Sequence, residues 1–174
     1  MRAVMTVLAT QRAQVAERLG REPRGLREIA VADEAGHPRV IRVASLVERT
    51  PFPTMFWLVD PVLNYRIDRE EASGLIARFQ RQVDEDPALQ KCMAEDHAAH
   101  VKLRDEHLAT DERQALEQLG FADVLRQRGI GGIADSGRIR CLHTWYAAHL
   151  VVPNTIGRLL DAHWAAQPAA DSEA

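Results

Sequence analysis

The chain has little of what marks several protein classes. Its 174 residues include only two cysteines, Cys92 and Cys141, which are too few for the disulfide framework of a small secreted protein. No apolar stretch approaches the length of a membrane span, and the first residues lack the cleavage pattern of a signal peptide. These absences predict a cytoplasmic protein without a membrane span.

An excess of one charge sign is also missing. The 22 basic and 25 acidic residues are mixed along the chain and give a net charge of -3. This balance provides no general attraction to nucleic acid or to an anionic membrane, so neither is an expected partner. The length suits one folded unit. We assign residues 1–166 to a single domain and the small, polar residues 167–174 to a disordered tail.

The N-terminal third predicts a helix followed by a small sheet. Two β-prone runs, 26–32 and 39–47, flank a turn that contains Gly36, which favours a hairpin. The apolar run 55–59 ends at Asp60-Pro61 and predicts a strand buried on both faces. The preceding helix is indicated by apolar residues at helical spacing that stop at Gly20: Val4, Leu8, Val15 and Leu19.

The rest of the chain is predominantly helical in pattern. Asp68 and Glu71 have capping-box spacing ahead of an apolar stripe from Leu75 to Val83. Asp86-Pro87 predicts the start of a second helix that runs to His107. A third begins near Asp111 and breaks near Gly120.

After a glycine-rich loop we expect a short strand over 138–141, a helix over 143–151 and a last helix from Asn154 to Trp164. The fold class is therefore α+β. A small antiparallel sheet from the N-terminal half packs with helices from the C-terminal two-thirds.

Soft and titratable side chains are concentrated around Cys141-Leu142-His143, with His149 six residues further on. Thiolate and imidazole donors suit zinc, iron or copper. The C-x-H spacing matches no standard zinc motif, so further ligands would have to come from elsewhere. The alternative is structural, because Cys141, Trp145 and His149 also fit one buried helical face.

A second group lies on one predicted helical stripe, with Asp96 four residues before His100, where it could orient the imidazole ring. A metal site or a proton relay could be built from these residues, and a solvated polar face is the alternative. The stripe consists of His97, His100, Arg104 and His107.

The glycines of the 129–132 loop do not form a nucleotide motif. The expected order is helix, loop and strand, and no Lys-Ser/Thr follows, unlike a phosphate loop. Arg138 and Arg140 could still bind an anion beside Gly131 and Gly132. A catalytic triad around Cys141 stays undecided, because its geometry with His143 depends on whether this segment is strand or helix.

Several motifs together resemble a bacterial domain-of-unknown-function family, number 501, which is common in actinobacteria. They occur in the family's order and cover nearly the whole chain. The matching pieces are GREPRG at 20–25, GHPRVI at 36–41, PFPTMFWL at 51–58, Ala99-His100, Gly131-Gly132, IRCLH at 139–143, Ala148-His149, Asn154 and Gly157.

The resemblance implies a small cytoplasmic protein without an established activity. Its genes often lie beside those for enolase, a septum-formation protein and an exopolyphosphatase-like protein. The family pattern has cysteine at the positions of Asp33 and Asp60, whereas Cys141 and His143 match it. The resemblance thus suggests a scattered ligand set drawn from the 33–37 turn, the end of the 55–60 strand and the C-L-H segment.

Three hypotheses follow. The first is a metal-binding protein, or a small metalloenzyme, that uses Asp33, Asp60, Cys141, His143 and His149, with His100 and Asp96 as supporting groups. Oxygen and imidazole donors would favour iron or manganese over structural zinc. The opposing interpretation is that the metal was lost and the aspartates are ordinary turn residues.

The second hypothesis is a non-catalytic interaction module linked to cell-envelope or division control. The third is an anion or phosphate-ester site at Gly131, Gly132, Arg138 and Arg140. The sequence identifies neither a small-molecule ligand nor a protein partner, and it leaves the oligomeric state open.

Overall fold

The computed structural model describes residues 7–167 and begins with the expected helix, α1 (Ala9–Leu19). It ends at Gly20, whose φ of 66° lies in the left-handed region that glycine adopts without strain. Val15 is its fully buried residue. Val4, which the sequence pattern places on the same stripe, lies outside the described residues.

Three strands form the antiparallel sheet: β1 (Leu26–Ala32), β2 (Pro38–Val43) and β5 (Phe56–Leu58). The order is β1-β2-β5, so β2 is central, and its Ile41 pairs with Ile29 on one side and Trp57 on the other. This confirms the predicted α+β class and the antiparallel sheet.

The run predicted as one strand over 39–47 is divided. Its end forms β3 (Leu46–Val47), which pairs with β4 (Thr50–Pro51) in a separate hairpin. Glu48 and Arg49 make the turn with φ values of 48° and 65°. A two-residue turn with positive φ at both positions matches the twist of such a hairpin.

The capping box predicted at Asp68 and Glu71 is wrong, because both residues lie within a helix over residues 61–72. Helix α2 (Pro61–Ala72) begins directly after the sheet, and Asp60 caps it by accepting hydrogen bonds from the amides of Val62 and Leu63. Asp68 and Glu71 therefore lie inside α2. Gly74, with a φ of 85°, separates α2 from α3 (Leu75–Glu85).

Helix α4 (Pro87–His107) has the predicted bounds. Asp86 accepts hydrogen bonds from the amides of Ala88 and Leu89, which would otherwise lack partners at the helix start. The break at Gly120 is also confirmed: it lies between α5 (Thr110–Gln118) and α6 (Ala122–Arg126) and has a φ of 74°.

The strand predicted over 138–141 is wrong. A short 3₁₀ turn, η1 (Ile130–Gly132), is followed by a loop that leads directly to α7 (Leu142–Val151). The Gln80 side chain accepts a hydrogen bond from the Ile139 amide at 2.9 Å and donates one to the Gly137 carbonyl at 2.8 Å. A side chain from α3 thus takes the place of a neighbouring strand.

The last helix, α8 (Thr155–Ala166), begins as expected at Asn154, whose side chain accepts a hydrogen bond from the Gly157 amide at 2.8 Å. Gln167, the first residue of the predicted tail, donates to Glu70 at 2.9 Å. The rest of that tail, 168–174, lies outside the described residues. No helix within residues 7–167 is long and apolar enough to cross a membrane.

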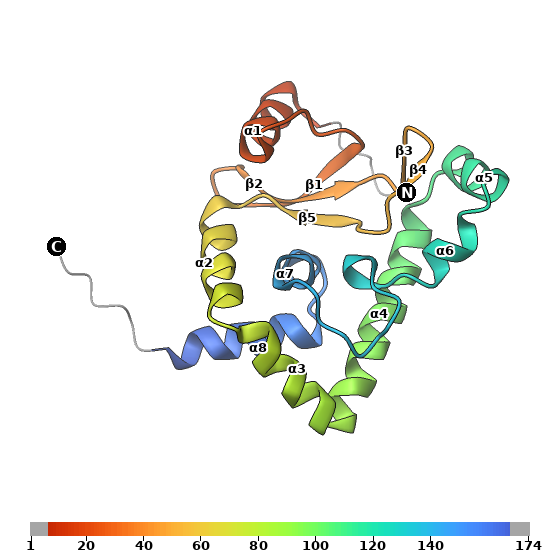
Figure 1. Ribbon diagram of the computed structural model, residues 1–174. Coiled ribbons are helices and arrows are strands. Elements are labelled where there is room, and N and C mark those ends of the chain that lie inside the picture. The colour runs from red at the N-terminus through yellow and green to blue at the C-terminus, as the bar shows by residue number, and fades with distance from the viewer. Residues whose placement is uncertain (1–6, 168–174) are drawn as a thin grey trace.

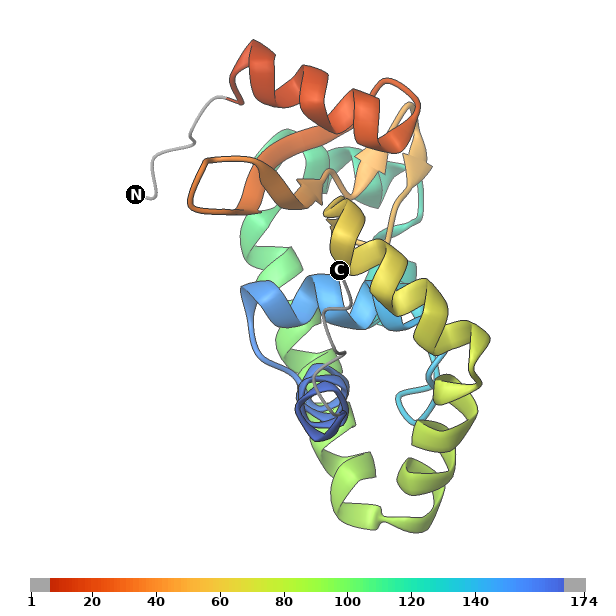
Figure 2. The ribbon, with the colours of Figure 1, turned by 90° about the vertical axis from the view of Figure 1, so that its left-hand side faces the viewer.

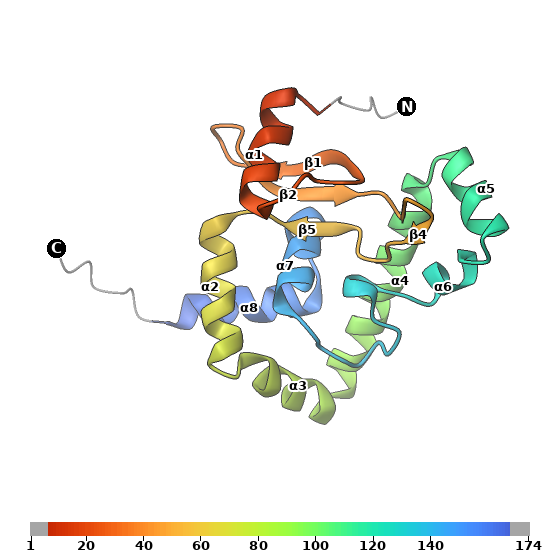
Figure 3. The same cartoon turned by 45° about the horizontal axis from the view of Figure 1, so that its top comes forward.

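The sheet lies between two helical layers (Figures 1 and 3). Helix α1 covers one face over a small core that includes Val15 and Ile41. Helix α7 packs under the other face, where Trp145 and Leu58 belong to the larger core. Figure 2 shows α1 and the turn between α3 and α4 at opposite ends of the molecule. Helix α7 therefore has other elements packed around it, including β5, α2 and α8, and these hold its first residues in place.

Candidate metal centre

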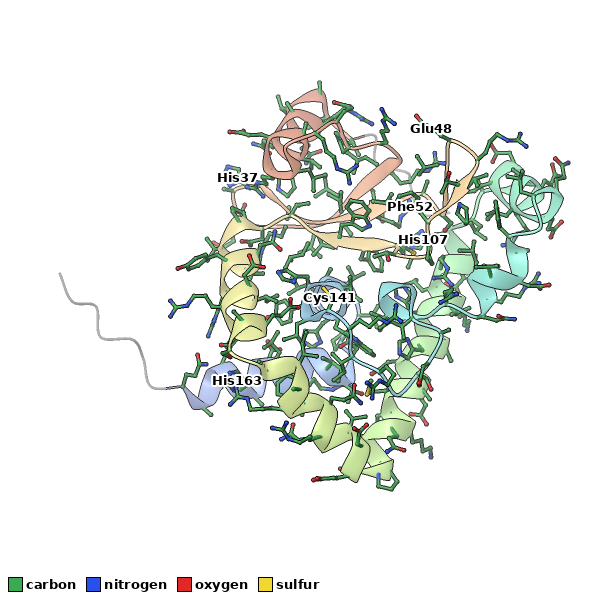
Figure 4. All side chains as sticks on the ribbon, viewed as in Figure 1. His37, Glu48, Phe52, His107, Cys141 and His163 are labelled. Atoms are coloured by element: carbon green, nitrogen blue, oxygen red, sulfur yellow. The ribbon has the colours of Figure 1, made fainter. Side chains whose placement is uncertain are left out.

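The N-terminus of α7 meets the last turns of α2. Cys141 is the residue before α7 and has an extended backbone, with φ -154° and ψ 123°. The amide of Leu142 donates a 2.6 Å hydrogen bond to Oε1 of Glu71. A carboxylate from α2 thus satisfies an amide that has no partner within its own helix. Figure 4 shows Cys141 at this end of α7, below the sheet.

His143 joins the two segments through both ring nitrogens. Nδ1 lies 3.6 Å from Sγ of Cys141 and 3.3 Å from Oε1 of Glu71. Nε2 lies 3.2 Å from Oδ1 of Asp68. The interaction with Cys141, supported by the two carboxylates and opposed by partial burial, raises the pKa of His143 to about 9. The imidazole is therefore cationic at neutral pH among acidic groups.

Cys141, His143 and Glu71 bring three ligand atoms within 4.8 Å of one another. Within residues 7–167 no other three His, Cys, Asp or Glu side chains form such a group. The sequence analysis identified Cys141 and His143 but missed Glu71 and Asp68, which it assigned to a helix cap. Their i, i+3 spacing was the available signal, since it places two carboxylates on one helical face.

Asp33 does not join this group. It lies in the turn between β1 and β2, where its carboxylate accepts from the His37 amide at 2.8 Å and lies 3.0 Å from the His37 ring. The hydrogen bond from that amide is the main reason for the lowered pKa of Asp33. Figure 4 shows His37 at the tip of the hairpin, well separated from Cys141.

Asp60 is also occupied elsewhere. Besides capping α2, it accepts a hydrogen bond from Nε of Arg39 at 2.8 Å. Partial burial opposes its charged form, but the Leu63 amide and the Arg39 guanidinium outweigh that effect and lower the pKa of Asp60. The two aspartates thus serve a turn and a helix cap.

His149 has partners for both ring nitrogens. Its Nδ1 accepts from the Asn154 amide at 3.0 Å, so the ring proton lies on Nε2, which is 2.9 Å from Asp161. Asp161 also accepts from the Tyr146 hydroxyl at 2.8 Å, and burial together with this bond raises the pKa of Tyr146. These bonds hold α7 against α8.

His100 and Asp96 both lie on α4, but no hydrogen bond joins these two side chains. Asp96 accepts from the Thr155 amide at 2.7 Å and so caps α8. His100 packs edge-on against Phe56, and its buried Nε2 has no hydrogen-bond partner within residues 7–167. Burial lowers the pKa of His100 to about 3, with a smaller contribution from Arg104, so the ring is neutral.

The glycines of the loop are explained by close packing. A Cβ on Gly131 would lie 2.6 Å from Oγ1 of Thr144, and one on Gly132 would lie 3.0 Å from Cγ of Pro53. Both have positive φ, 68° and 71°. Arg138 and Arg140 are exposed on the loop that follows. The glycines thus fit the loop closely against α7 and the segment before β5.

Comparison with family profiles matches residues 29–162 to the family described as "Protein of unknown function (DUF501)". Comparisons with curated proteins and with solved structures found no match. The matched range contains Glu71, Cys141 and His143, as well as the whole three-stranded sheet except its first three residues. Because the match covers more than half of the chain, this protein belongs to the DUF501 family.

Proposed function

We propose that the protein binds a divalent metal ion through Cys141, His143 and Glu71. The observation that carries the proposal is the convergence of a sulfur, a nitrogen and an oxygen donor within 4.8 Å of one another. The donors come from two segments that are seventy residues apart in sequence and are held together by the bond from the Leu142 amide to Glu71. Tertiary packing therefore brings the three donors together, which supports the proposal.

The donor set favours zinc or ferrous iron. Thiolate and imidazole are preferred by these metals over magnesium or calcium, which take oxygen ligands. Three protein ligands also leave a coordination position open, as in catalytic rather than structural zinc sites. A metal held this way would act as a Lewis acid or activate a water molecule. On this basis we propose a small metalloenzyme that works in a reducing compartment, such as the cytoplasm, because the thiol must stay reduced.

Asp68 supports the same assignment. Metal-bound histidines usually donate their second ring N–H to a carboxylate, which fixes the orientation of the ring. His143 has this arrangement, with Nδ1 toward Cys141 and Glu71 and Nε2 at 3.2 Å from Asp68. Oε1 of Glu71 is engaged by the Leu142 amide, and its Oε2 makes no hydrogen bond within residues 7–167. The Glu71 carboxylate therefore keeps free acceptor capacity with which we expect it to bind the ion.

The test is elemental analysis of protein purified without a histidine tag, followed by cobalt substitution. We expect near-stoichiometric metal in the wild type, its loss in Cys141→Ser and Glu71→Gln, and about tenfold weaker binding in Asp68→Asn. A thiolate-to-cobalt absorption band should disappear in Cys141→Ser. Cys92→Ser is the matched control, because Cys92 is exposed on α4 and far from the group in sequence.

A folded wild type that contains no metal and takes up none on titration would contradict the proposal. So would a cobalt band that survives Cys141→Ser. The first result would favour the interaction module, and the second would assign the metal to other ligands, with Cys92 as the sulfur donor.

A second candidate uses the same residues as a nucleophile, a base and an orienting group. Sγ of Cys141 lies 3.6 Å from Nδ1 of His143, whose other nitrogen lies 3.2 Å from Asp68. This is the order of groups in cysteine nucleophile sites. Alkylation by iodoacetamide should then be slowed at Cys141, and not at Cys92, by His143→Gln. Equal rates in wild type and variant would exclude this role.

A further inference from the structure

A second site is suggested by a sizeable cavity in the C-terminal half of the molecule. It lies between α4, α5, α6 and the loop that precedes α7, and has a volume of about 610 Å³. Figure 1 shows α5 and α6 beside α4 at the edge of the molecule, away from α2. Cavities of this size usually hold small molecules. The apolar part of its wall includes Val101, Leu108, Leu116, Leu125 and Ile133.

Arg104 brings a buried positive charge to this wall. Its side chain is 2% exposed and donates to the carbonyls of Pro53 at 2.8 Å, Arg128 at 2.6 Å and Leu125. Burial lowers the pKa of Arg104 to about 10, which still leaves it cationic at neutral pH. No carboxylate within residues 7–167 forms an ion pair with it. Buried charges are normally paired, whereas the nearby Asp105 favours this one without forming an ion pair with it and is itself paired with Arg113.

His97 adds a hydrogen-bond donor without an acceptor. It lies two helical turns before Arg104, lines the same cavity and is 7% exposed. Nδ1 accepts from the Ile130 amide at 2.9 Å, which places the ring proton on Nε2. Nε2 is buried and has no hydrogen-bond partner within residues 7–167. The backbone fixes the ring, since a Cβ on Gly129 would lie 1.9 Å from Nδ1.

Three more basic side chains line the cavity. Lys102, Arg113 and Arg126 line it together with Asp105 and Glu117. Arg113 is paired with Asp105 at 2.5 Å and Arg126 with Asp123 at 2.6 Å, whereas Lys102 makes no hydrogen bond or ion pair within residues 7–167. Lys102 and Arg104 are therefore the basic groups of the lining without an ion pair in the described residues, and beside an apolar wall they favour an anionic ligand over a neutral one.

A purely structural role does not account for all of these features. Arg104 ties α4 to the segment before β5 and to the end of α6, and this explains its three carbonyl partners. Carbonyl groups accept hydrogen bonds from its N–H donors but carry no net charge, so the guanidinium has no ion-pair partner within residues 7–167. They also leave the Nε2 proton of His97 without an acceptor. One anionic group between the two side chains would meet both needs.

We propose that this cavity binds a small organic anion, whose apolar body contacts Val101, Leu116 and Leu125 and whose head group is held by Arg104 and Nε2 of His97. Carboxylates and phosphate monoesters share this chemistry. The site is independent of Cys141, His143 and Glu71, because none of these three residues lines the cavity.

The first test compares three probes of equal chain length, octanoate, octyl phosphate and octanol, by calorimetry and thermal unfolding. We expect the better of the two anions to bind roughly tenfold or more tightly than octanol, as befits hydrogen bonds to a charged group. The tighter anion identifies the head group. Equal binding of all three probes, or binding of neither anion, would overturn the proposal.

Two variants locate the binding. Val101→Trp should fill the cavity and abolish binding of the anion. His97→Asn keeps an acceptor near the Ile130 amide but removes the Nε2 donor, so we expect a loss of about tenfold. Lys91→Ala, exposed on the same helix and outside the cavity, should bind as the wild type does.

Circular dichroism and metal content report whether each variant is folded and whether the Cys141 site is intact. Unchanged affinity in folded His97→Asn would overturn the assignment. If Val101→Trp does not fold, the comparison of His97→Asn with Lys91→Ala decides alone.

Discussion

Two histidines in this protein have opposite environments. His143 lies at the start of α7 among a thiol and two carboxylates, and its pKa is raised to about 9. His100 lies in the middle of α4 against the Phe56 ring, is 6% exposed, and has its pKa lowered to about 3. At neutral pH the first ring carries a charge and the second does not.

The difference shows why a histidine count says little about chemistry. Burial penalises the charged imidazole, whereas neighbouring carboxylates favour it. Around α7 the sequence supplies counter-charges from α2, and a cation or a metal ion can be held there. Around His100 on α4, burial and the nearby Arg104 instead disfavour the charged ring. The predictions below test this contrast.

Arg104→Ala should have the largest effect at neutral pH. The change removes the donors to the carbonyls of Pro53, Leu125 and Arg128 and leaves them unsatisfied in the interior. We expect the free energy of unfolding to fall by about 3 kcal/mol or more. Urea unfolding measures it, with the exposed Arg138→Ala as the control. Similar midpoints for the two variants would show that the three bonds contribute little.

Acid should lower the stability of the folded protein through protonation of His100. Its folded pKa of about 3 lies below the usual 6.5, so the unfolded chain takes up the proton first. Stability should therefore fall as the pH drops from about 6.5 toward 3, by about 1.4 kcal/mol per pH unit. His100→Phe, which cannot titrate, should remove most of this slope in urea unfolding at a series of pH values. An unchanged slope would mean that other groups cause it.

Alkali should lower the stability of the folded protein through deprotonation of His143. Its folded pKa is raised, so the stabilisation is complete below about 6.5 and is lost as the pH rises through about 9. Because the ring is partly exposed, we expect a loss of about 1 kcal/mol. The measurement uses protein with a metal chelator, and His143→Gln should be nearly independent of pH over this window. His37→Gln, on the exposed hairpin, should behave as the wild type does.

Asp33→Ala should have the smallest effect. Its carboxylate bonds only within its own exposed turn, to the His37 amide and ring. We expect metal content equal to that of the wild type and the smallest change in melting temperature of the variants described above. Loss of metal in Asp33→Ala, but not in Glu71→Gln, would instead support the scattered site inferred from the resemblance.

Much of the helical framework could be predicted because its signals are local. Asp86-Pro87 and Asn154 each supply the hydrogen bonds of a helix start within three residues, and Gly20 permits the left-handed turn that ends α1. The capping box at Asp68 and Glu71 was wrong for a related reason. Acidic residues at i, i+3 have the same pattern at the start of one helix and near the end of another.

The loop over 138–141 shows where local signals fail. Its side chains are β-prone, but the Ile139 amide bonds to the Gln80 side chain and not to a neighbouring strand. Nothing in the segment itself indicates a partner that is 59 residues away. The same limit applied to the 39–47 run, where residues 44 and 45 separate β2 from β3 and β3 pairs with β4 instead.

The candidate metal centre was half predictable. By itself, the sequence determined that Cys141 and His143 are donors two residues apart, and that α7 begins close to them. Only the tertiary structure brings Glu71 to these two residues and Asp68 to the other side of the His143 ring, and leaves Asp33 and Asp60 in a turn and a helix cap elsewhere. The reason is physical: α7 is buried beneath the sheet and packs against α2, so its first free amide takes Glu71 as a partner and brings a distant carboxylate to the cysteine and the histidine.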